Sequence, residues 1–308
     1  MRLGVLDIGS NTVHLLVCDV AAGSAPLPAF SVKESLGLIG HLTEAGSFDD
    51  SMVSHLSEII GELKTRANSN GCQEILAFAT SAIRDASNGQ VVLDQVIKQT
   101  KQHISVLSGE DEARLTFLAT RRWFGWSSGV LLGLDIGGGS FEIAIGAGEV
   151  PETAISLPLG AGRLTKDFNL SDPPTKKQLS VMNEYIYGHL ESVVDQITTE
   201  SGADHVVGTS KTFRSLARIV GAAPSDDGPF VQRLLPAYKL KDIAERVAGM
   251  SVQQRAMLPG VSKDRAAQLA AGAMVAAAIV DLLEISEIEI CPWALREGVL
   301  LRHIDSLS

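Results

Sequence analysis

The chain has 308 residues, of which 45% are apolar and 20% are charged, and this composition is typical of a globular protein. Its formal net charge of −10 argues against a broad basic surface for duplex nucleic acid. Its three cysteines are far apart, which excludes a disulfide framework and a cysteine-rich metal site. The length predicts two domains.

Two segments bear on targeting. The start, MRLGVLDIGS, has no charged region followed by a long apolar stretch, so we expect no signal peptide. The longest apolar run, residues 266–283, is mostly alanine and includes Gln268 and Asp281, which favours a buried helix over a membrane span. We therefore expect a soluble, cytoplasmic protein that does not enter a membrane.

The first part of the chain alternates strands and helices. RLGVLDIGS and NTVHLLVCDV predict two strands joined by a glycine turn, which is a β-hairpin. Helical spacing over residues 48–70 predicts a helix that ends at an Asn-Gly pair. EILAFAT follows as a strand, and VLSGEDEARLTFLATRRWF as a strand end and a helix with acids in its first turn. GWSSG, residues 125–129, is the expected domain boundary.

The second part opens on the same pattern, since VLLGLDIGGGSFEIAIGAGEV again predicts strand, turn and strand. A strand near ETAISLPLG, a helix near 175–201, the strand HVVGTS and the helix KTFRSLARIV follow. The remainder is mainly helical, with an interruption at LPGVSKDRA, and closes with a short strand and a final helix.

Because an Asp-Ile-Gly hairpin opens each half, we predict two α/β halves whose turns line a cleft between them. The arrangement resembles the superfamily of actin, heat-shock chaperones and sugar kinases. The predicted fold class is α/β, with two actin-like (ribonuclease H-like) domains and an active-site cleft between the domains. We expect the first domain to span residues 1–127 and the second 128–293, with a final helix at about 294–308 packed back onto the first.

The second turn, DIGGGS, is suited to holding phosphate. Gly137, Gly138 and Gly139 expose consecutive amides, Ser140 adds a hydroxyl, and Asp135 stands at the strand end, where it suits a cation or a water. The alternative is a hairpin turn that needs glycine for positive φ. Since two such turns occur in matching contexts, we favour phosphate binding by both, and the first turn contributes Gly9, Ser10 and Asn11.

A third glycine turn lies at a strand-to-helix junction. Gly208, Thr209 and Ser210 would offer amides and hydroxyls to an anion at a helix start, but an ordinary N-cap explains them equally well. Arg84, just beyond a strand end, suits a phosphoryl group, and the alternative is a surface ion pair with Asp85.

Three acids follow one another in LSGEDEARLTF. Glu110 and Asp111 are explained by their position in the first turn of a helix. A carboxylate that points into a phosphate site would suit a general base that activates water. Spacing alone does not choose among Glu110, Asp111 and Glu112. The histidines, His14 among them, form no metal-binding cluster and are interpreted as structural or exposed.

Taken together, the motifs resemble the exopolyphosphatase and guanosine pentaphosphate phosphohydrolase (Ppx/GppA) family. The matching stretches, in the family's order, are DIGSNTVHLLV, ATSAIRDASN, VLSGEDEARL, LDIGGGSFEI, LPLGAGRLT, GTSKTFRSLA, LPGVSKDRA and WALREGVL. The resemblance implies hydrolysis of a terminal phosphoryl group in the cleft.

Residue roles follow from the same resemblance. It implies that Glu112 is the base, Arg84 the phosphate clamp and GGGS a phosphate loop, while Asp7, Asp135 and Glu142 lie around a divalent metal, Mg²⁺ or Mn²⁺. Asp111 departs from the Glu that is common in the family, but Glu112 is retained. The short chain resembles exopolyphosphatases more than pentaphosphate hydrolases.

The expected function is therefore metal-dependent release of orthophosphate from inorganic polyphosphate. The alternatives are hydrolysis of pppGpp to ppGpp, in the stringent response, and a non-hydrolytic nucleotide-binding regulator. We expect a homodimer. Because the net charge is negative, local cations must hold a polyanion, and the candidates are Arg84, Arg163, Lys211, Arg214, Lys263 and Arg265.

Overall fold

The structure is a computed structural model that describes residues 1–41, 43, 45–198 and 202–307. The chain forms two compact units, one of Met1–Leu115 with Leu295–Ser308 and one of Thr116–Ala294. The division falls inside a single helix, α4 (Gly109–Phe124). The domain limits predicted from the sequence, 1–127 and 128–293, stay a prediction.

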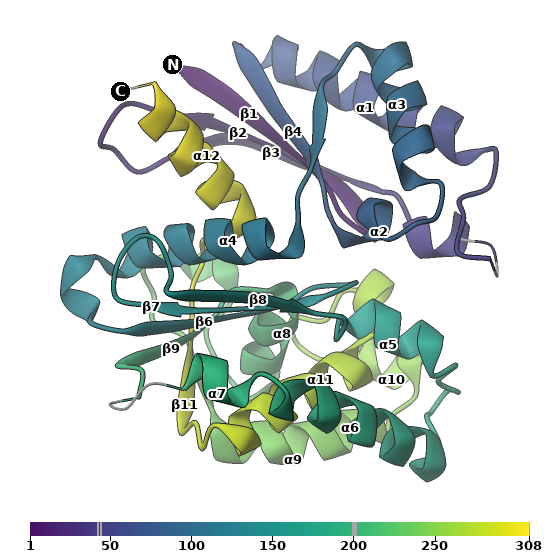
Figure 1. The fold of residues 1–308 in the computed structure, drawn as a ribbon, viewed down its shortest axis with the longest axis vertical. Helices are drawn as coiled ribbons and strands as arrows, with labels where there is room; N and C mark the ends of the chain where they lie inside the picture. Colours follow the sequence, from purple (N-terminus) through teal and green to yellow (C-terminus); the bar gives the residue numbers. More distant parts are fainter. Residues whose placement is uncertain (42, 44, 199–201, 308) are drawn as a thin grey trace. The chain divides into compact units, whose positions relative to one another are not determined.

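The first unit is built on a five-stranded sheet in the order β3-β2-β1-β4-β5 (Figure 1). The first three strands form an antiparallel meander, and the other two run parallel to β1. The predicted opening hairpin is therefore confirmed. The strands are β1 (Arg2–Ile8), β2 (Thr12–Asp19), β3 (Leu27–Ser35), β4 (Glu74–Ala79) and β5 (Ile104–Val106).

Both faces of this sheet are covered, because alternate residues of its strands are apolar on each side. Ile8 and Val13 pack in a cluster with α1 and α3, whereas Leu3 and Val5 pack in another with the last helix, α12. Figure 1 shows α12 on the opposite side of the sheet from α1 and α3. The helices are α1 (Met52–Ser69), α2 (Ser81–Arg84), α3 (Gly89–Thr100) and α12 (Leu295–Ser306), with a short 3₁₀ turn, η1 (Leu38–His41).

Close packing of α12 depends on Gly298. A Cβ atom at this position would lie 1.9 Å from the carbonyl oxygen of Leu115, so α12 must move if one is added. We expect Gly298→Ala to lower the free energy of unfolding by about 1–3 kcal/mol, as overpacking does. Urea denaturation measures this. Gly61→Ala in α1, where the new methyl meets nothing within 4 Å, is the control and should stabilise by about 0.5–1 kcal/mol. Equal effects of the two substitutions would contradict the expectation.

The second unit repeats this arrangement in a six-stranded sheet, β10-β11-β9-β6-β7-β8. Its meander is β6-β7-β8, and β9 and β11 continue parallel to β6, while β10 is an antiparallel edge. Each unit thus has the strand order of a ribonuclease H-like, actin-like domain, and the predicted fold class is confirmed at this level. The strands are β6 (Leu131–Ile136), β7 (Phe141–Gly146), β8 (Thr153–Leu157), β9 (His205–Gly208), β10 (Leu234–Pro236) and β11 (Glu287–Ile290).

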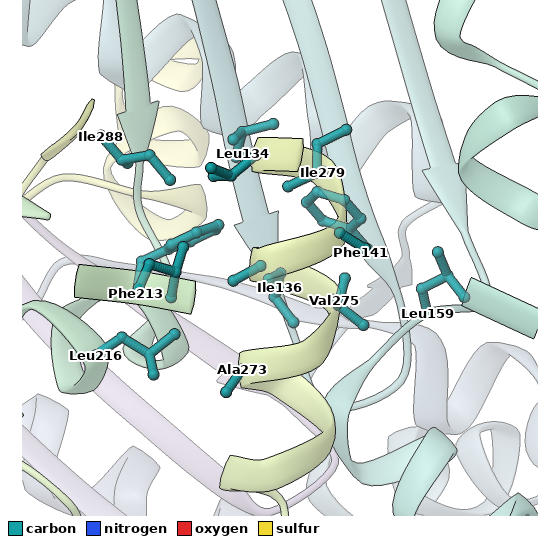
Figure 2. Packing of buried hydrophobic residues seen from close by; sticks show 14 of the residues in the cluster. Leu134, Ile136, Phe141, Leu159, Phe213, Leu216, Ala273, Val275, Ile279 and Ile288 are labelled. Atoms are coloured by element: carbon teal, nitrogen blue, oxygen red, sulfur yellow. The ribbon is translucent and has the colours of Figure 1, made fainter. Parts of the chain in front are cut away.

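The core of the second unit centres on α11, the alanine-rich segment. Figure 2 shows Ala273, Val275 and Ile279 of this helix among the apolar side chains of the sheet and of α8. The interpretation as a buried helix is confirmed, and no helix in the described part of the chain is long and apolar enough to span a membrane. The helices are α5 (Ala161–Asp167), α6 (Lys176–Glu191), α7 (Val194–Ile197), α8 (Lys211–Ile219), α9 (Ala237–Ala248), α10 (Val252–Arg255) and α11 (Leu269–Leu282), with 3₁₀ turns η2 (Trp126–Ser128), η3 (Ser225–Asp227) and η4 (Lys263–Arg265).

A few elements differ from the expectation. The helix expected near 175–201 is two helices, α6 and α7, with a break before Val194, and its last residues, 199–201, lie outside the described part. The sequence patterns do not predict β3, β10 or α3, and of β5 they predict only the end, at Val106. Most side chains of β3 are exposed or only half-buried, so it carries little of the apolar signal that marks a strand.

Arg121 holds residues 125–129, the expected domain boundary, by hydrogen bonds. Its guanidinium is 1% exposed and donates to the carbonyl oxygens of Gly129 and Gly146 and to the Ser128 hydroxyl, at 2.7, 2.8 and 2.8 Å. Burial lowers the pKa of Arg121, but a guanidinium stays charged at any ordinary pH. Residues 125–129 are therefore a fixed part of the second unit.

Candidate active site

In the first unit, Arg84 and Glu112 form one group. The Arg84 guanidinium donates to the Glu112 carboxylate, to the Leu107 carbonyl oxygen at 2.9 Å and to Asp85 at 3.2 Å. Burial by itself would lower the pKa of Arg84, but the charges and hydrogen bonds of Glu112 and Asp85 outweigh it and raise the pKa. The two residues that the resemblance names as clamp and base are therefore in direct contact, and the ion pair with Asp85 is also present.

The three neighbouring acids of α4 have different surroundings. Glu112 is 6% exposed, whereas the Glu110 side chain is 60% exposed and pairs with Arg114 on the same helix. Asp111 accepts a hydrogen bond from Ser108 at the helix start. The spacing of the three acids did not choose among them, but their surroundings differ, because only Glu112 is buried and in contact with Arg84.

A second group in this unit surrounds the first Asp-Ile-Gly turn. Asp7 pairs across the hairpin with His14, and Arg296 of α12 reaches both, with 3.4 Å from its Nη1 to an Asp7 oxygen. His14 is 5% exposed and its Nε2 lies 2.7 Å from the Ser31 hydroxyl. His14 is thus structural, as interpreted, but it belongs to a polar chain that ends at Asp7.

In the second unit, the turn Gly137–Ser140 is held by its carbonyl groups. Those of Gly137 and Gly138 accept from the amides of Ala161 and Arg163, at 3.0 and 2.9 Å, and that of Gly139 accepts from the Arg163 side chain at 2.6 Å. A trans peptide points its N–H opposite to its C=O. The amides of Gly138, Gly139 and Ser140 consequently point away from α5, in the manner of a backbone anion site.

Glycine is needed in this region for close approach. A Cβ atom at Gly160 would lie 2.2 Å from the carbonyl carbon of Gly139. None of the described residues with positive φ lies between Gly137 and Ser140. The alternative explanation of the turn, glycine for positive φ, therefore does not account for it.

Asp135 and Glu142 are directly opposite each other on β6 and β7, so their side chains leave the same face of the sheet. Asp135 accepts a hydrogen bond from the Thr209 hydroxyl, and Glu142 from the Ser156 hydroxyl at 2.9 Å. Two carboxylates suit Mg²⁺, which completes its shell with water or substrate oxygens. Among the described residues, no group of three or more acidic, histidine or cysteine side chains is placed to hold a metal.

Two of the three residues of the third glycine turn, Gly208 and Ser210, have structural roles. Ser210 caps α8 by accepting from the Phe213 amide, and a Cβ atom at Gly208 would lie 2.7 Å from the Phe213 ring. Thr209 differs, because its hydroxyl is bound to Asp135. The N-cap interpretation thus holds for Ser210, and substrate roles for the three residues stay predictions.

Among the candidate cations, Arg163 contacts the Gly137–Ser140 turn. Its side chain donates to the Gly139 carbonyl oxygen. Gln268 also lies close to the turn, because a Cβ atom added at Gly162 would be 3.0 Å from the Gln268 side chain and 3.0 Å from the Gly138 carbonyl oxygen. Burial would raise the pKa of Asp264, but hydrogen bonds and the charges of Arg265 and Lys211 lower it.

Arg214 is occupied elsewhere, since it donates to the carbonyl oxygens of Cys291 and Pro292 at 3.2 and 3.0 Å. Sequence reasoning missed Arg296, Gln268 and the polar role of His14. The internal repeat was a usable signal for His14, because it stands seven positions after Asp7, as Glu142 does after Asp135. That the groups of the two units face one cleft stays a prediction.

Comparisons with known proteins show the family of this chain. The family model described as "Ppx/GppA phosphatase family" matches residues 16–307. A relative from Mycobacterium tuberculosis named "Exopolyphosphatase 1" is 49% identical over 306 residues, which cover 99% of this chain and 89% of the relative. A "Guanosine-5'-triphosphate,3'-diphosphate pyrophosphatase" from Vibrio parahaemolyticus is 27% identical, over 98% of this chain and 59% of its own.

Solved structures show the same fold. An exopolyphosphatase from Cytophaga hutchinsonii superposes with a TM-score of 0.87 at 24% identity, covering 99% of this chain and 98% of the other. The Aquifex aeolicus member of the Ppx/GppA family gives 0.83 at 24% identity, covering 100% and 99%. With a family model matched over nearly its whole length and relatives close to half identical, this chain belongs to the Ppx/GppA phosphatase family.

Proposed function

We propose that this protein is an exopolyphosphatase, a hydrolase that releases orthophosphate from the end of inorganic polyphosphate. One observation supports the phosphate chemistry above the others, namely the three amides of Gly138, Gly139 and Ser140 that point away from α5. Consecutive amides of this kind bind anionic oxygens. The family is one of phosphatases, which agrees with this chemistry.

The choice of substrate rests on the relatives. Those 47–49% identical to this chain are named exopolyphosphatase 1, and they match 99% of it. The relatives named guanosine pyrophosphatases are 27% identical. Polyphosphate is therefore proposed ahead of pppGpp, which stays the alternative.

In the proposed reaction, a water oxygen attacks the terminal phosphorus and the P–O–P bond breaks. Glu112 accepts the proton of that water, and the leaving oxygen stays on the shortened chain. In the structure, the Glu112 carboxylate is paired with the Arg84 guanidinium. A terminal phosphate that bound the Arg84 guanidinium would replace Glu112 as its partner, and the Glu112 carboxylate could then accept a proton from the attacking water. Substrate binding would thereby create the base, and hydrolysis would not proceed from the ion-paired state.

Asp135 and Glu142 are the residues proposed to hold Mg²⁺ or Mn²⁺. Their oxygens lie on one face, and the hydroxyls of Thr209 and Ser156 orient them. When bound, the ion would neutralise charge on the phosphate oxygens as the P–O bond breaks. Asp7 has a different partner, Arg296.

The test is phosphate release from polyphosphate of defined lengths beside pppGpp, at equal concentrations of terminal phosphate. The proposal expects a kcat/KM for polyphosphate well above that for pppGpp. A reversed preference would establish the alternative, and release from neither substrate would contradict hydrolysis altogether. A homodimer, a cytoplasmic location and a part in the stringent response remain predictions.

Affinity for long chains should depend on local cations. Lys263 and Arg265 lie on either side of Asp264 in η4, and the charge of Lys211 also acts on the Asp264 carboxylate. We expect the double substitution Lys263→Ala/Arg265→Ala to raise KM for long polyphosphate more than KM for short polyphosphate. Added salt should also raise the long-chain KM more than the short-chain KM, since screening weakens the attraction of exposed charges. KM measured for both lengths at low and high ionic strength checks this. A long-chain KM that neither change affects would mean that only terminal phosphates are bound.

A further inference from the structure

The two copies of the repeated hairpin carry different charges at equivalent places. Asp7 is opposite His14 in the first copy, and Asp135 is opposite Glu142 in the second. Directly opposed residues share one face of the sheet. The second hairpin therefore presents two carboxylates, as a cation requires, whereas the first presents one carboxylate and one imidazole.

Arg296 brings a positive charge to the first hairpin. Its Nη1 lies 3.4 Å from Asp7 and also contacts Nδ1 of His14. A guanidinium only donates hydrogen bonds, so His14 Nδ1 accepts, and the ring is neutral with its proton on Nε2. That proton is then donated to the Ser31 hydroxyl at 2.7 Å. The positive charge of Arg296 is consequently balanced by Asp7 and not by His14.

Asp7 also borders the first turn. A Cβ atom at Gly9 would lie 3.9 Å from one oxygen of Asp7, while the other oxygen faces Arg296. The carbonyl groups of Ser10 and Asn11 accept from the amides of Leu38 and Leu36, at 3.0 and 2.9 Å. An uncompensated carboxylate at this place would repel any phosphate that approached Gly9, Ser10 or Asn11.

We infer that Arg296 is a positioning residue that neutralises Asp7 and makes the first turn acceptable to a phosphate group. The two hairpins then divide the work, the first serving the anionic substrate and the second the metal. This inference rests on the proposed function and assigns Asp7 a role other than metal binding. Without Arg296, the charge of Asp7 should weaken phosphate binding by about 10-fold.

The experiment compares Arg296→Met, Asp7→Asn and the double variant with wild type. One readout is KM and kcat for polyphosphate. The other is calorimetric binding of methylenediphosphonate, in which a carbon replaces the bridging oxygen and prevents hydrolysis. We expect Arg296→Met to weaken binding about 10-fold, and the double variant to return within about threefold of wild type, because both charges are then gone.

Arg302→Met, a charge loss at an exposed position on the same helix, is the matched control and should leave both readouts unchanged. A double variant as weak as Arg296→Met would show that Arg296 acts through packing, and would overturn the inference. If Arg296→Met does not fold, Asp7→Asn alone decides: the inference requires binding at least as tight as wild type, and a loss greater than about threefold overturns it. Failure of the proposed function is seen separately, as a wild-type protein that releases no phosphate.

Discussion

Replacing Glu112 with Gln is expected to lower kcat for polyphosphate by ~10²–10⁴, with little change in substrate binding. The substitution keeps the shape of the side chain and removes its capacity to accept a proton. Glu112 is 6% exposed and is bound to Arg84, so a terminal phosphate that Arg84 bound would lie beside its carboxylate. Steady-state kinetics and calorimetric binding of methylenediphosphonate separate the two effects.

Glu110→Gln is the matched control for this prediction. It removes the same charge from the same turn of α4, but the Glu110 side chain is 60% exposed and pairs only with Arg114 among the ion pairs of the described residues. We expect its kcat to stay within about twofold of wild type, since exposed ion pairs contribute little. Equal losses in the two variants would show that negative charge at the helix start matters, and not a base at Glu112.

The second large effect is expected in metal binding. Asp135→Asn and Glu142→Gln should each weaken binding of Mn²⁺, measured by calorimetry without substrate, by at least about 100-fold. Loss of residues that only orient a ligand already costs 10–100-fold, so loss of a carboxylate ligand should cost no less. The two side chains share one face of β6 and β7, which is why both should matter.

Asp7→Asn distinguishes the two hairpins in this experiment. Because Asp7 is paired with Arg296, we expect its substitution to leave Mn²⁺ affinity within about threefold of wild type. A loss as large as that of Asp135→Asn would return Asp7 to the metal, as the family resemblance implies, and would contradict the division of work between the hairpins. Unchanged affinity in all three variants would place the metal elsewhere.

Much of the architecture was predictable because its signals are local. The repeated Asp-Ile-Gly hairpin predicted two α/β halves of the same kind. The strand orders of the two sheets confirm this prediction. The helix expected to end at Asn-Gly ends there, with Asn70 as its C-cap and Gly71 at φ +74°. Elements with weak apolar patterns, such as β3, were missed, since pairing with a neighbouring strand and not burial defines them.

The sequence by itself determined the chemistry that is present: the acids of α4, Arg84 beyond β4, and the glycine turn that joins the two strands of each hairpin. These are properties of residue type and of position within one element, which short-range rules describe. Only the tertiary structure decided which acid meets Arg84, because helix phase and burial separate Glu112 from its neighbours. It also decided the partner of Asp7, since Arg296 stands 289 positions away and meets it only when α12 packs on the first sheet. Contacts between residues so distant in sequence depend on the whole fold, and no local pattern encodes them.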